Sequence, residues 1–337
     1  MLAQTKLIGV VIPCYKVSTH ICDLIRRVGD EVAIIIVVDD CCPEKSGMLV
    51  ARTCTDPRVR VVYHQTNQGV GGAVLTGYQT ATKAGADVIV KIDGDGQMDP
   101  ALIPAFIAPI LCGEADYTKG NRFFEIETIL QMPLMRIIGN AGLSFLTKLS
   151  SGYWNVFDPT NGYTAISAKV AERLSVEKIS RGYFFESDML FRLNTMRAVV
   201  MDIPMFARYG DEQSNLNVPR ELPRFLCMNL KNLAKRIGYN YFIRNFNYAT
   251  LELVCGLPLL SFGIIFGSIS WIELSRQGTF ASSGTVMLAA LPTIMGLQLL
   301  LGFINYDMAS VPRTPLQQRL STDARHAMQS KATSTAP

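Results

Sequence analysis

Residues 88–100 read VIVKIDGDGQMDP, which predicts a buried strand that ends in two carboxylates, Asp93 and Asp95, separated by one glycine. Gln97 follows two residues later. Oxygen ligands at the end of a strand are typical of sites for hard cations such as Mg²⁺ and Mn²⁺, and a bound diphosphate can complete the coordination. The alternative is an Asp/Gly turn that only ends the strand. The stretch therefore indicates a candidate metal site.

Several other kinds of site are excluded by composition and spacing. An EF-hand loop starting at Asp93 fails, because its sixth and twelfth positions are Met98 and Pro104 instead of Gly and Glu. The eight cysteines never show C-x-x-C spacing, which argues against zinc and against a disulfide framework. The net charge of +4 comes without a strongly basic run, so we expect no nucleic-acid partner.

The first 220 residues alternate between strand and helix patterns. Strands are expected at 7–13, 32–38, 58–64, 88–92, 164–167 and 198–204, with a short strand and a turn at 115–122. Helices are expected at 17–28, 45–54, 100–112, 133–149 and 183–193, and the loop 65–72 opens another helix that runs to about residue 84. This alternation predicts an α/β fold with a mostly parallel sheet and helices on both faces. Ligands bind such sheets beyond the carboxyl ends of the strands. Asp39, Asp40, Asn67, Asp93 and Asp95 should therefore lie along one edge.

The last third of the chain changes character. Residues 249–272 and 283–303 are each long and apolar enough to cross a bilayer, which makes residues 248–305 a two-helix transmembrane hairpin. Basic residues lie on both outer flanks, whereas Arg276 is the single base in the connecting loop 273–282. The positive-inside rule then predicts a multi-pass protein of the cytoplasmic membrane with its α/β domain in the cytoplasm. The N-terminus shows no apolar signal segment, which agrees with this expectation.

Two further segments have amphipathic patterns. Residues 221–247 predict a juxtamembrane amphipathic helix. In the helix expected at 133–150, Arg136 and Asn140 share the polar face. That helix could lie on a membrane surface or face an ordinary core, and periodicity does not separate the two. We expect residues 306–337 to form a flexible cytoplasmic tail.

Six motifs occur in a recognisable order. They are VIPCYK (residues 11–16), VDD (38–40), NQG (67–69), DGDGQ (93–97), GNR (120–122) and YGDEQS (209–214). This set resembles inverting family 2 glycosyltransferases, and most closely the polyprenyl-phosphate glycosyltransferases, which include dolichyl-phosphate mannose synthase. The resemblance implies a GT-A domain over residues 1–220, a divalent metal (Mg²⁺ or Mn²⁺), a nucleotide-diphosphate sugar, a polyprenyl phosphate acceptor and a homo-oligomer.

The resemblance also implies residue roles, motif by motif. The residues expected to bind the donor are Pro13, Tyr15, Asp39, Asp40, Asn67, Asp93 and Arg208. Those expected to bind the metal are Asp93, Asp95 and Gln97. Arg122, Arg136 and Asn140 are expected to bind the acceptor phosphate, and Glu186 and Asp188 to position the sugar. Asp95, Asp158, Arg122 and Arg136 are the expected catalytic group. A phosphate monoester is ionised near pH 7, so a general base is less needed here and the role of Asp158 stays open.

The expected function is transfer of one sugar, from a UDP-hexose or alternatively GDP-mannose, to a polyprenyl phosphate at the cytoplasmic face. A processive polysaccharide synthase is the rival within the class, but only two spans follow the domain and no Gln-x-x-Arg-Trp motif occurs. A membrane-tethered sugar nucleotidyltransferase would also need a strand-end acid pair. A non-catalytic nucleotide-sugar-binding subunit would bind donor without turnover.

Overall fold

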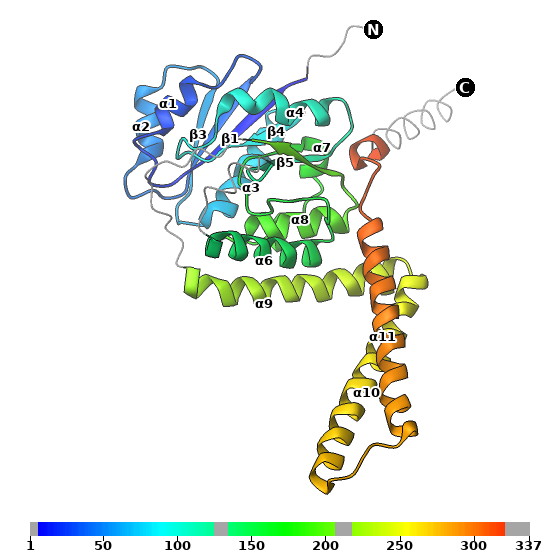
Figure 1. Ribbon diagram of the computed structural model, residues 1–337. Helices are drawn as coiled ribbons and strands as arrows, with labels where there is room; N and C mark the ends of the chain where they lie inside the picture. The colour runs from blue at the N-terminus through cyan, green and yellow to red at the C-terminus, as the bar shows by residue number, and fades with distance from the viewer. Residues whose placement is uncertain (1–5, 125–133, 206–217, 321–337) are drawn as a thin grey trace, which may run out of the picture. The chain divides into compact units, whose positions relative to one another are not determined.

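A seven-stranded mixed sheet forms the centre of the α/β part of the chain (Figure 1). The computed structural model describes residues 6–124, 134–205 and 218–320. The strands are β1 (Ile8–Cys14), β2 (Ile34–Asp39), β3 (Val59–Tyr63), β4 (Val88–Lys91), β5 (Tyr117–Asn121), β6 (Thr164–Ser167) and β7 (Val200–Pro204). Their order is β3-β2-β1-β4-β6-β5-β7, and β6 alone runs antiparallel to its neighbours. The predicted mostly parallel α/β sheet is confirmed.

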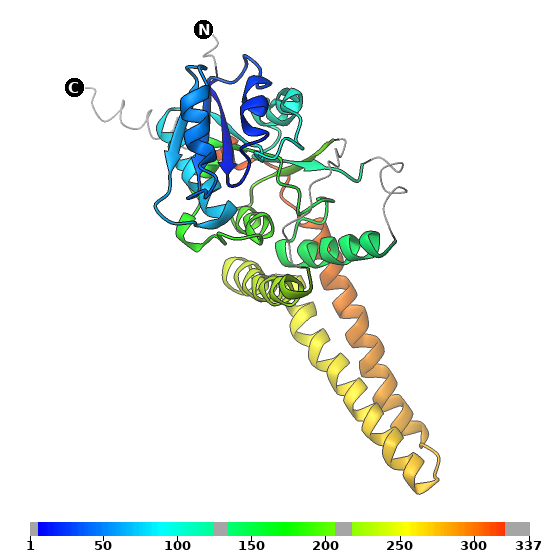
Figure 2. The ribbon, with the colours of Figure 1, turned by 90° about the vertical axis from the view of Figure 1, so that its left-hand side faces the viewer.

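Helices cover both faces of this sheet (Figure 2). They are α1 (Ile21–Arg26), α2 (Ser46–Thr53), α3 (Gly69–Lys83), η1 (Pro100–Leu102), α4 (Ile103–Leu111), α6 (Leu134–Ser151), α7 (Ala168–Ala171), η2 (Val176–Lys178) and α8 (Phe185–Thr195). On β1, Val10 and Ile12 join the core that α1 and α4 complete. Val11 points to the other face and packs on α3 at Gly77, where a Cβ would collide with it. The uninterrupted apolar runs thus become strands buried on both sides.

Two compact units make up the chain. The α/β unit comprises Met1–Leu233 and Pro312–Pro337, and the second unit is Ala234–Val311. The second unit contains the π-helical segment η3 (Gly238–Arg244) and the helices α10 (Tyr248–Gln277) and α11 (Ser283–Ala309). Both α10 and α11 are long and apolar enough to cross a membrane, with a mean hydropathy of 2.0 each. They coincide with the two predicted spans.

Caps and glycines explain the geometry of the α10–α11 pair. Asn247 and Ser282 cap the starts of α10 and α11, and Gly278 ends α10 with a φ of +61°. Gly263 lies against Thr293 of the opposite helix, where a Cβ would collide with it. The helices therefore approach closely through a small residue, as membrane helices commonly do.

Helix α9 (Val218–Ile237) contacts the α/β unit through two buried asparagines and through Phe225, which packs edge to face on Phe184. Asn229 is buried and accepts a hydrogen bond from Ser150 Oγ of α6 at 2.6 Å, and buried Asn232 bonds to Asp188 of α8 at 3.0 Å. Leu226 and Leu230 are exposed. The α-helix runs from residue 218 to 237 instead of the predicted 221–247, with the π-helical segment η3 after it, and its exposed leucines point away from the domain it packs on.

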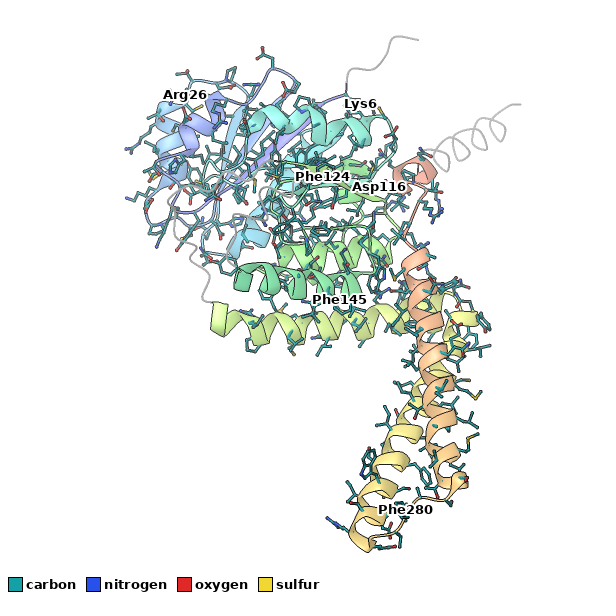
Figure 3. All side chains as sticks on the ribbon, viewed as in Figure 1. Lys6, Arg26, Asp116, Phe124, Phe145 and Phe280 are labelled. Carbon is teal, nitrogen blue, oxygen red and sulfur yellow. The ribbon has the colours of Figure 1, made fainter. Side chains whose placement is uncertain are left out.

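The chain after α11 returns to the α/β unit. We expected a flexible tail from residue 306, but α11 extends to Ala309 and residues 312–320 are ordered. The reason is the fully buried carboxylate of Asp116, labelled in Figure 3, which accepts hydrogen bonds from the amides of Leu316 (2.6 Å) and Gln317 (2.8 Å). The Gln317 side chain adds bonds to the carbonyls of Ile110 and Ala115. Residues 321–337 lie outside the described part.

Candidate active site

The acid pair follows β4, as predicted. Asp95 accepts a hydrogen bond from the amide of Gln97 at 3.0 Å, and Gly96 between them has a φ of +79°, which favours glycine. Asp93 and Asp95 are both half-buried. The tight turn therefore presents carboxylates at the carboxyl end of a central strand, where parallel sheets bind their ligands.

A buried lysine lies behind this pair. Lys91, the last residue of β4, is 1% exposed, and its Nζ lies 2.8 Å from Asp93 Oδ1 and 3.3 Å from Glu186 Oε1. Burial alone would lower the pKa of Lys91, but the two carboxylates raise it above its ordinary value, so the side chain is charged. Lys91 was not predicted as a site residue, because it stands inside an apolar strand run and belongs to no motif.

Asp39 and Asp40 at the end of β2 are buried and bind backbone amides. Asp39 accepts from the amides of Cys42 (2.7 Å) and Gly47 (2.8 Å). Asp40 accepts from the amides of Gln68 and Gly69, both at 2.8 Å, and pairs with His64 at 2.7 Å. These carboxylates hold the loops that surround the edge of the sheet. Their direct contact with a donor stays a prediction.

The other predicted donor residues lie around the same edge. Pro13 is in β1, and Tyr15 follows that strand with 44% of its surface exposed. Asn67 donates from Nδ2 to the carbonyl of Asp40 at 3.2 Å, next to the start of α3. Arg208 lies outside the described residues. The strand ends thus gather the described donor candidates, as expected for a parallel sheet.

Arg122 and Asp158, both predicted as catalytic, contact each other. Arg122 donates from Nε to Asp158 Oδ2 at 2.7 Å and from Nη2 to Oδ1 at 3.1 Å. Asp158 is fully buried, whereas the Arg122 side chain is 31% exposed. Such a bidentate pair fixes the plane of a guanidinium group. Arg136 and Asn140 lie in α6, but their side chains are outside the described part.

The two acids predicted to position the sugar have different surroundings. Glu186 pairs with Lys91, as described above, and so lies close to the acid pair. Asp188 is buried and accepts hydrogen bonds from the amide of Ser180 at 2.8 Å and from Asn232 at 3.0 Å. Asp188 therefore joins α8 to α9, and Glu186 is the better placed of the two for a ligand.

Two further titratable residues of the sheet, buried Lys119 and half-buried Asp202, were not predicted. Lys119 of β5 stands in register with Asp202 of β7. Burial lowers the pKa of Lys119 to about 8, against the opposing effect of Glu186 and Asp158. Burial likewise raises the pKa of Asp202 to about 6. Sequence periodicity gives no sign of such residues, because they occupy ordinary strand positions.

The side-chain oxygens after β4 fit a hard divalent cation only if a bound ligand supplies further coordinating oxygens. Among the described residues, no group of three or more His, Cys, Asp or Glu side chains could hold a metal ion. The oxygens of Asp93, Asp95 and Gln97 are of the kind Mg²⁺ and Mn²⁺ prefer, and Mg²⁺ sites commonly take one or two carboxylates with substrate phosphates. The residues therefore fit a cation shared with a diphosphate.

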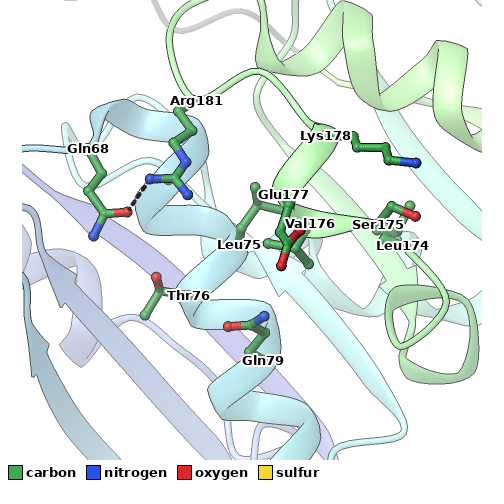
Figure 4. A pocket seen from close by; sticks show the side chains of 11 residues that line it. Gln68, Leu75, Thr76, Gln79, Leu174, Ser175, Val176, Glu177, Lys178 and Arg181 are labelled. Atoms are coloured by element: carbon green, nitrogen blue, oxygen red, sulfur yellow. Dashed lines mark hydrogen bonds between the residues drawn. The ribbon is translucent and has the colours of Figure 1, made fainter.

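A groove of about 550 Å³ runs along α3 (Figure 4). Its lining includes Gln68, Gln79, Lys178 and Arg181, and Arg181 donates to Gln68 Oε1 at 3.1 Å. None of the predicted site residues lines it. The candidate site is therefore the acid-rich edge of the sheet, and we assign no ligand to the groove.

Comparison with known proteins identifies the class of the domain. Residues 9–175 match the family model described as glycosyl transferase family 2. One relative, the UDP-N-acetylglucosamine–dolichyl-phosphate N-acetylglucosaminyltransferase of Methanococcus voltae, is 29% identical over 220 residues, which cover 61% of this chain and 87% of the relative. Another, the undecaprenyl-phosphate mannosyltransferase of Micrococcus luteus, is 29% identical over 199 residues, covering 58% and 81%.

Solved structures share the fold. The glucosyl-3-phosphoglycerate synthase of Mycobacterium tuberculosis, solved in complex with Mn²⁺, UDP and phosphoglyceric acid, superposes with a TM-score of 0.51 at 19% identity. The match covers 69% of this chain and 79% of that one. The GT-A fold that the sequence motifs implied is therefore confirmed.

Proposed function

A family 2 glycosyltransferase domain occupies residues 9–175 of this enzyme, and from that premise we propose that it transfers a single sugar from a nucleotide-diphosphate sugar to a polyprenyl phosphate. The observation that carries the lipid acceptor is the pair of helices, α10 and α11, each long and apolar enough to cross a membrane. Relatives named for dolichyl-phosphate and undecaprenyl-phosphate support the same acceptor class. We favour a UDP-hexose as donor, with GDP-mannose as the alternative.

The edge of the sheet supplies the donor half of the proposed site. The loops after β1 and β2, with Pro13, Tyr15, Asp39, Asp40 and Asn67, would surround the nucleoside, and Arg208 would face the diphosphate. Asp93, Asp95 and Gln97 would hold Mg²⁺ or Mn²⁺. When bound, the cation would neutralise charge on the departing nucleotide diphosphate.

Arg122, Arg136 and Asn140 supply the proposed acceptor half. Guanidinium groups bind phosphate oxygens bidentately, so they would orient the lipid phosphate toward the anomeric carbon of the sugar. One phosphate oxygen forms the new bond to that carbon as the bond to the nucleotide diphosphate breaks, with inversion. Because the phosphate is already ionised, we assign Asp158 to orienting Arg122 instead of taking up a proton.

The proposed orientation follows from charge. Lys and Arg residues flank the hairpin before α10 and after α11, and the loop 273–282 between the helices carries one, Arg276. By the positive-inside rule, this charge distribution supports a cytoplasmic location for both flanks and for the catalytic domain. Cysteine accessibility in intact cells, probed at Cys41 and at a cysteine introduced in place of Ala281, tests this orientation.

A nucleotide-release assay tests the function. We expect purified full-length protein with Mg²⁺ or Mn²⁺ to release UDP or GDP only when polyprenyl phosphate is present. Turnover without metal, or equal turnover without lipid, would contradict the proposal. Release of pyrophosphate from NTP and sugar phosphate would instead identify a nucleotidyltransferase, and donor binding without turnover a non-catalytic subunit.

A further inference from the structure

Lys91 joins two parts of the site that are far apart in the chain. Its Nζ lies 2.8 Å from Asp93 on the loop after β4 and 3.3 Å from Glu186 in the first turn of α8, 95 residues away. The lysine is 1% exposed, and the side chains of Asp93 and Glu186 are 29% and 13% exposed. The ammonium group of Lys91 is therefore enclosed, while the two carboxylates that it binds keep some access to the surface.

The backbone closes the arrangement from a third side. Gly162, just before β6, lies so near that a Cβ there would collide with Asp93 Oδ2 and Lys91 Nζ. On the preceding residue, the carbonyl of Asn161 accepts a hydrogen bond from buried Lys119. Asp93 thus has one oxygen against Lys91 and the other against Gly162, which leaves its carboxylate little freedom to rotate.

Stability alone gives a poor reason for this arrangement. A buried ion pair costs desolvation that its attraction often fails to recover, and well-packed apolar residues of similar volume are commonly as stable. Replacing only Lys91 by a neutral residue is different, because it leaves the carboxylates of Asp93 and Glu186 close together with no positive charge between them. An arrangement of this kind is more readily explained by a need to fix the two acids in place.

We propose, on the basis of the proposed function, that Lys91 is a positioning residue that holds Asp93 and Glu186 at a fixed distance from each other. The cation-bound diphosphate and the donor sugar would then bind to a preformed surface. Without Lys91, repulsion would separate the two carboxylates. Misplacement of a binding group by about 1 Å can cost about 100-fold in rate. Lys91 itself need not touch the substrate.

Binding of Mn²⁺ and UDP, measured by calorimetry on the full-length protein without acceptor, tests this role. In Lys91→Met we expect the Mn²⁺ affinity in the presence of UDP to fall by about 10-fold to 100-fold, the usual effect of losing a residue that orients a metal ligand. Lys83→Met, which removes an exposed lysine at the end of α3, is the matched control and should stay within about twofold. Far-ultraviolet circular dichroism verifies that each variant is folded.

The outcomes separate the two proposals. Wild-type affinity in folded Lys91→Met would overturn the role of Lys91 and leave the proposed function standing. A wild-type protein that binds neither Mn²⁺ nor UDP would overturn the proposed function itself. If Lys91→Met does not fold, Glu186→Gln is the second test. This variant keeps the buried Lys91–Asp93 pair but removes the charge through which Lys91 holds Asp93 in a fixed relation to α8. We then expect at least about a threefold loss of Mn²⁺ affinity with UDP, and an unchanged affinity would overturn the proposal.

Discussion

The two acids after β4 have distinct surroundings although they stand two residues apart. Asp93 is bound by buried Lys91, whereas Asp95 accepts a hydrogen bond from the backbone of its own turn. Lys91 thus fixes the carboxylate of Asp93, and the turn fixes that of Asp95, so both acids are held in place for the proposed cation.

Asp95→Asn should lower turnover by at least about 100-fold with the fold intact, because the amide removes the negative charge that the cation requires. Steady-state nucleotide release and circular dichroism measure the two effects. Asp30→Asn, at an exposed position, is the control. Retention of most activity in Asp95→Asn would refute the assignment of the metal site.

Arg136→Ala should raise the KM for the polyprenyl phosphate by about 10-fold or more and leave the donor KM within about twofold. The reason is that a charge-assisted hydrogen bond contributes about 1.5–3 kcal/mol to phosphate binding. Initial rates with each substrate varied in turn provide the test. A change confined to the donor KM would place Arg136 on the other half of the site.

Asp202 gives a prediction about pH. Its pKa rises from 3.8 to about 6 through burial, and among the described residues its Oδ1 has no hydrogen-bond partner. Between those pH values the folded state holds a proton that the unfolded state has lost, so the free energy of unfolding falls as pH rises through this range. The charged carboxylate then destabilises the fold at neutral pH by about 2–3 kcal/mol.

Asp202→Asn removes this cost. At about pH 7.5 we expect its unfolding temperature to exceed that of the wild type by about 4–10 °C, and the gain should shrink as the pH is lowered from about 6 to about 4. Thermal unfolding followed by circular dichroism at several pH values measures the difference. A gain of equal size at every pH would show that the effect does not come from titration of Asp202.

The sequence could predict where site residues lie, but not what they contact. Acids at strand ends were found because parallel strands bring their carboxyl ends together. Sequence does not show that Asp39 and Asp40 bind loop amides, or that Arg122 and Asp158 bind each other. Lys91 stayed hidden because a lysine inside an apolar run carries no motif, and only the packing of α8 against the sheet gives it a second carboxylate.

At the scale of elements, strands and helices were predicted closely wherever the periodicity is strong. The expected strand at 164–167 matches β6 residue for residue, and the helix expected to end near Ala84 ends at Lys83 in α3. The antiparallel direction of β6 could not be foreseen, because a four-residue apolar run reads the same in both directions. The burial of Asn229 and Asn232 on α9 likewise depends on Ser150 and Asp188, which lie far away in sequence.

The sequence pattern also does not predict that residues 312–320 pack against Asp116. This contact leads to a prediction about stability. Asp116 is fully buried and accepts hydrogen bonds from the amides of Val199, Leu316 and Gln317. In Asp116→Asn an amide N–H group would face these donors. Leaving buried donors unsatisfied costs about 1–3 kcal/mol, so we expect the unfolding temperature to fall by about 3–8 °C.

Differential scanning calorimetry and limited proteolysis test this prediction together. Residues 312–320 should become more accessible to protease in Asp116→Asn than in the wild type. Asp23→Asn, which alters an exposed pair with Arg26 on α1, should change neither measurement, because such surface pairs contribute little. An equally protected segment in both variants would mean that Asp116 does not hold it.

For the whole molecule, the sequence indicated an α/β glycosyltransferase domain joined to a membrane hairpin, and the structure divides the chain in a related but different way. The predicted domain ends at residue 220, whereas the α/β unit continues to Leu233 and resumes at Pro312. Asn229 and Asn232 of α9, and the amides of Leu316 and Gln317, form hydrogen bonds with buried polar side chains of this unit. Hydropathy detects apolar spans well and does not detect such polar contacts.

The proposed acceptor is a lipid, so partitioning of the labelled product between organic solvent and water shows whether the sugar is transferred to it. Full-length protein is incubated with radiolabelled nucleotide sugar, polyprenyl phosphate and Mg²⁺ or Mn²⁺, and the mixture is extracted with organic solvent. We predict that label enters the organic phase only when lipid phosphate and metal are both present, and that Asp95→Asn leaves it in water. Label that stays in the aqueous phase with the wild-type protein, or that moves equally well without polyprenyl phosphate, would contradict the proposed function.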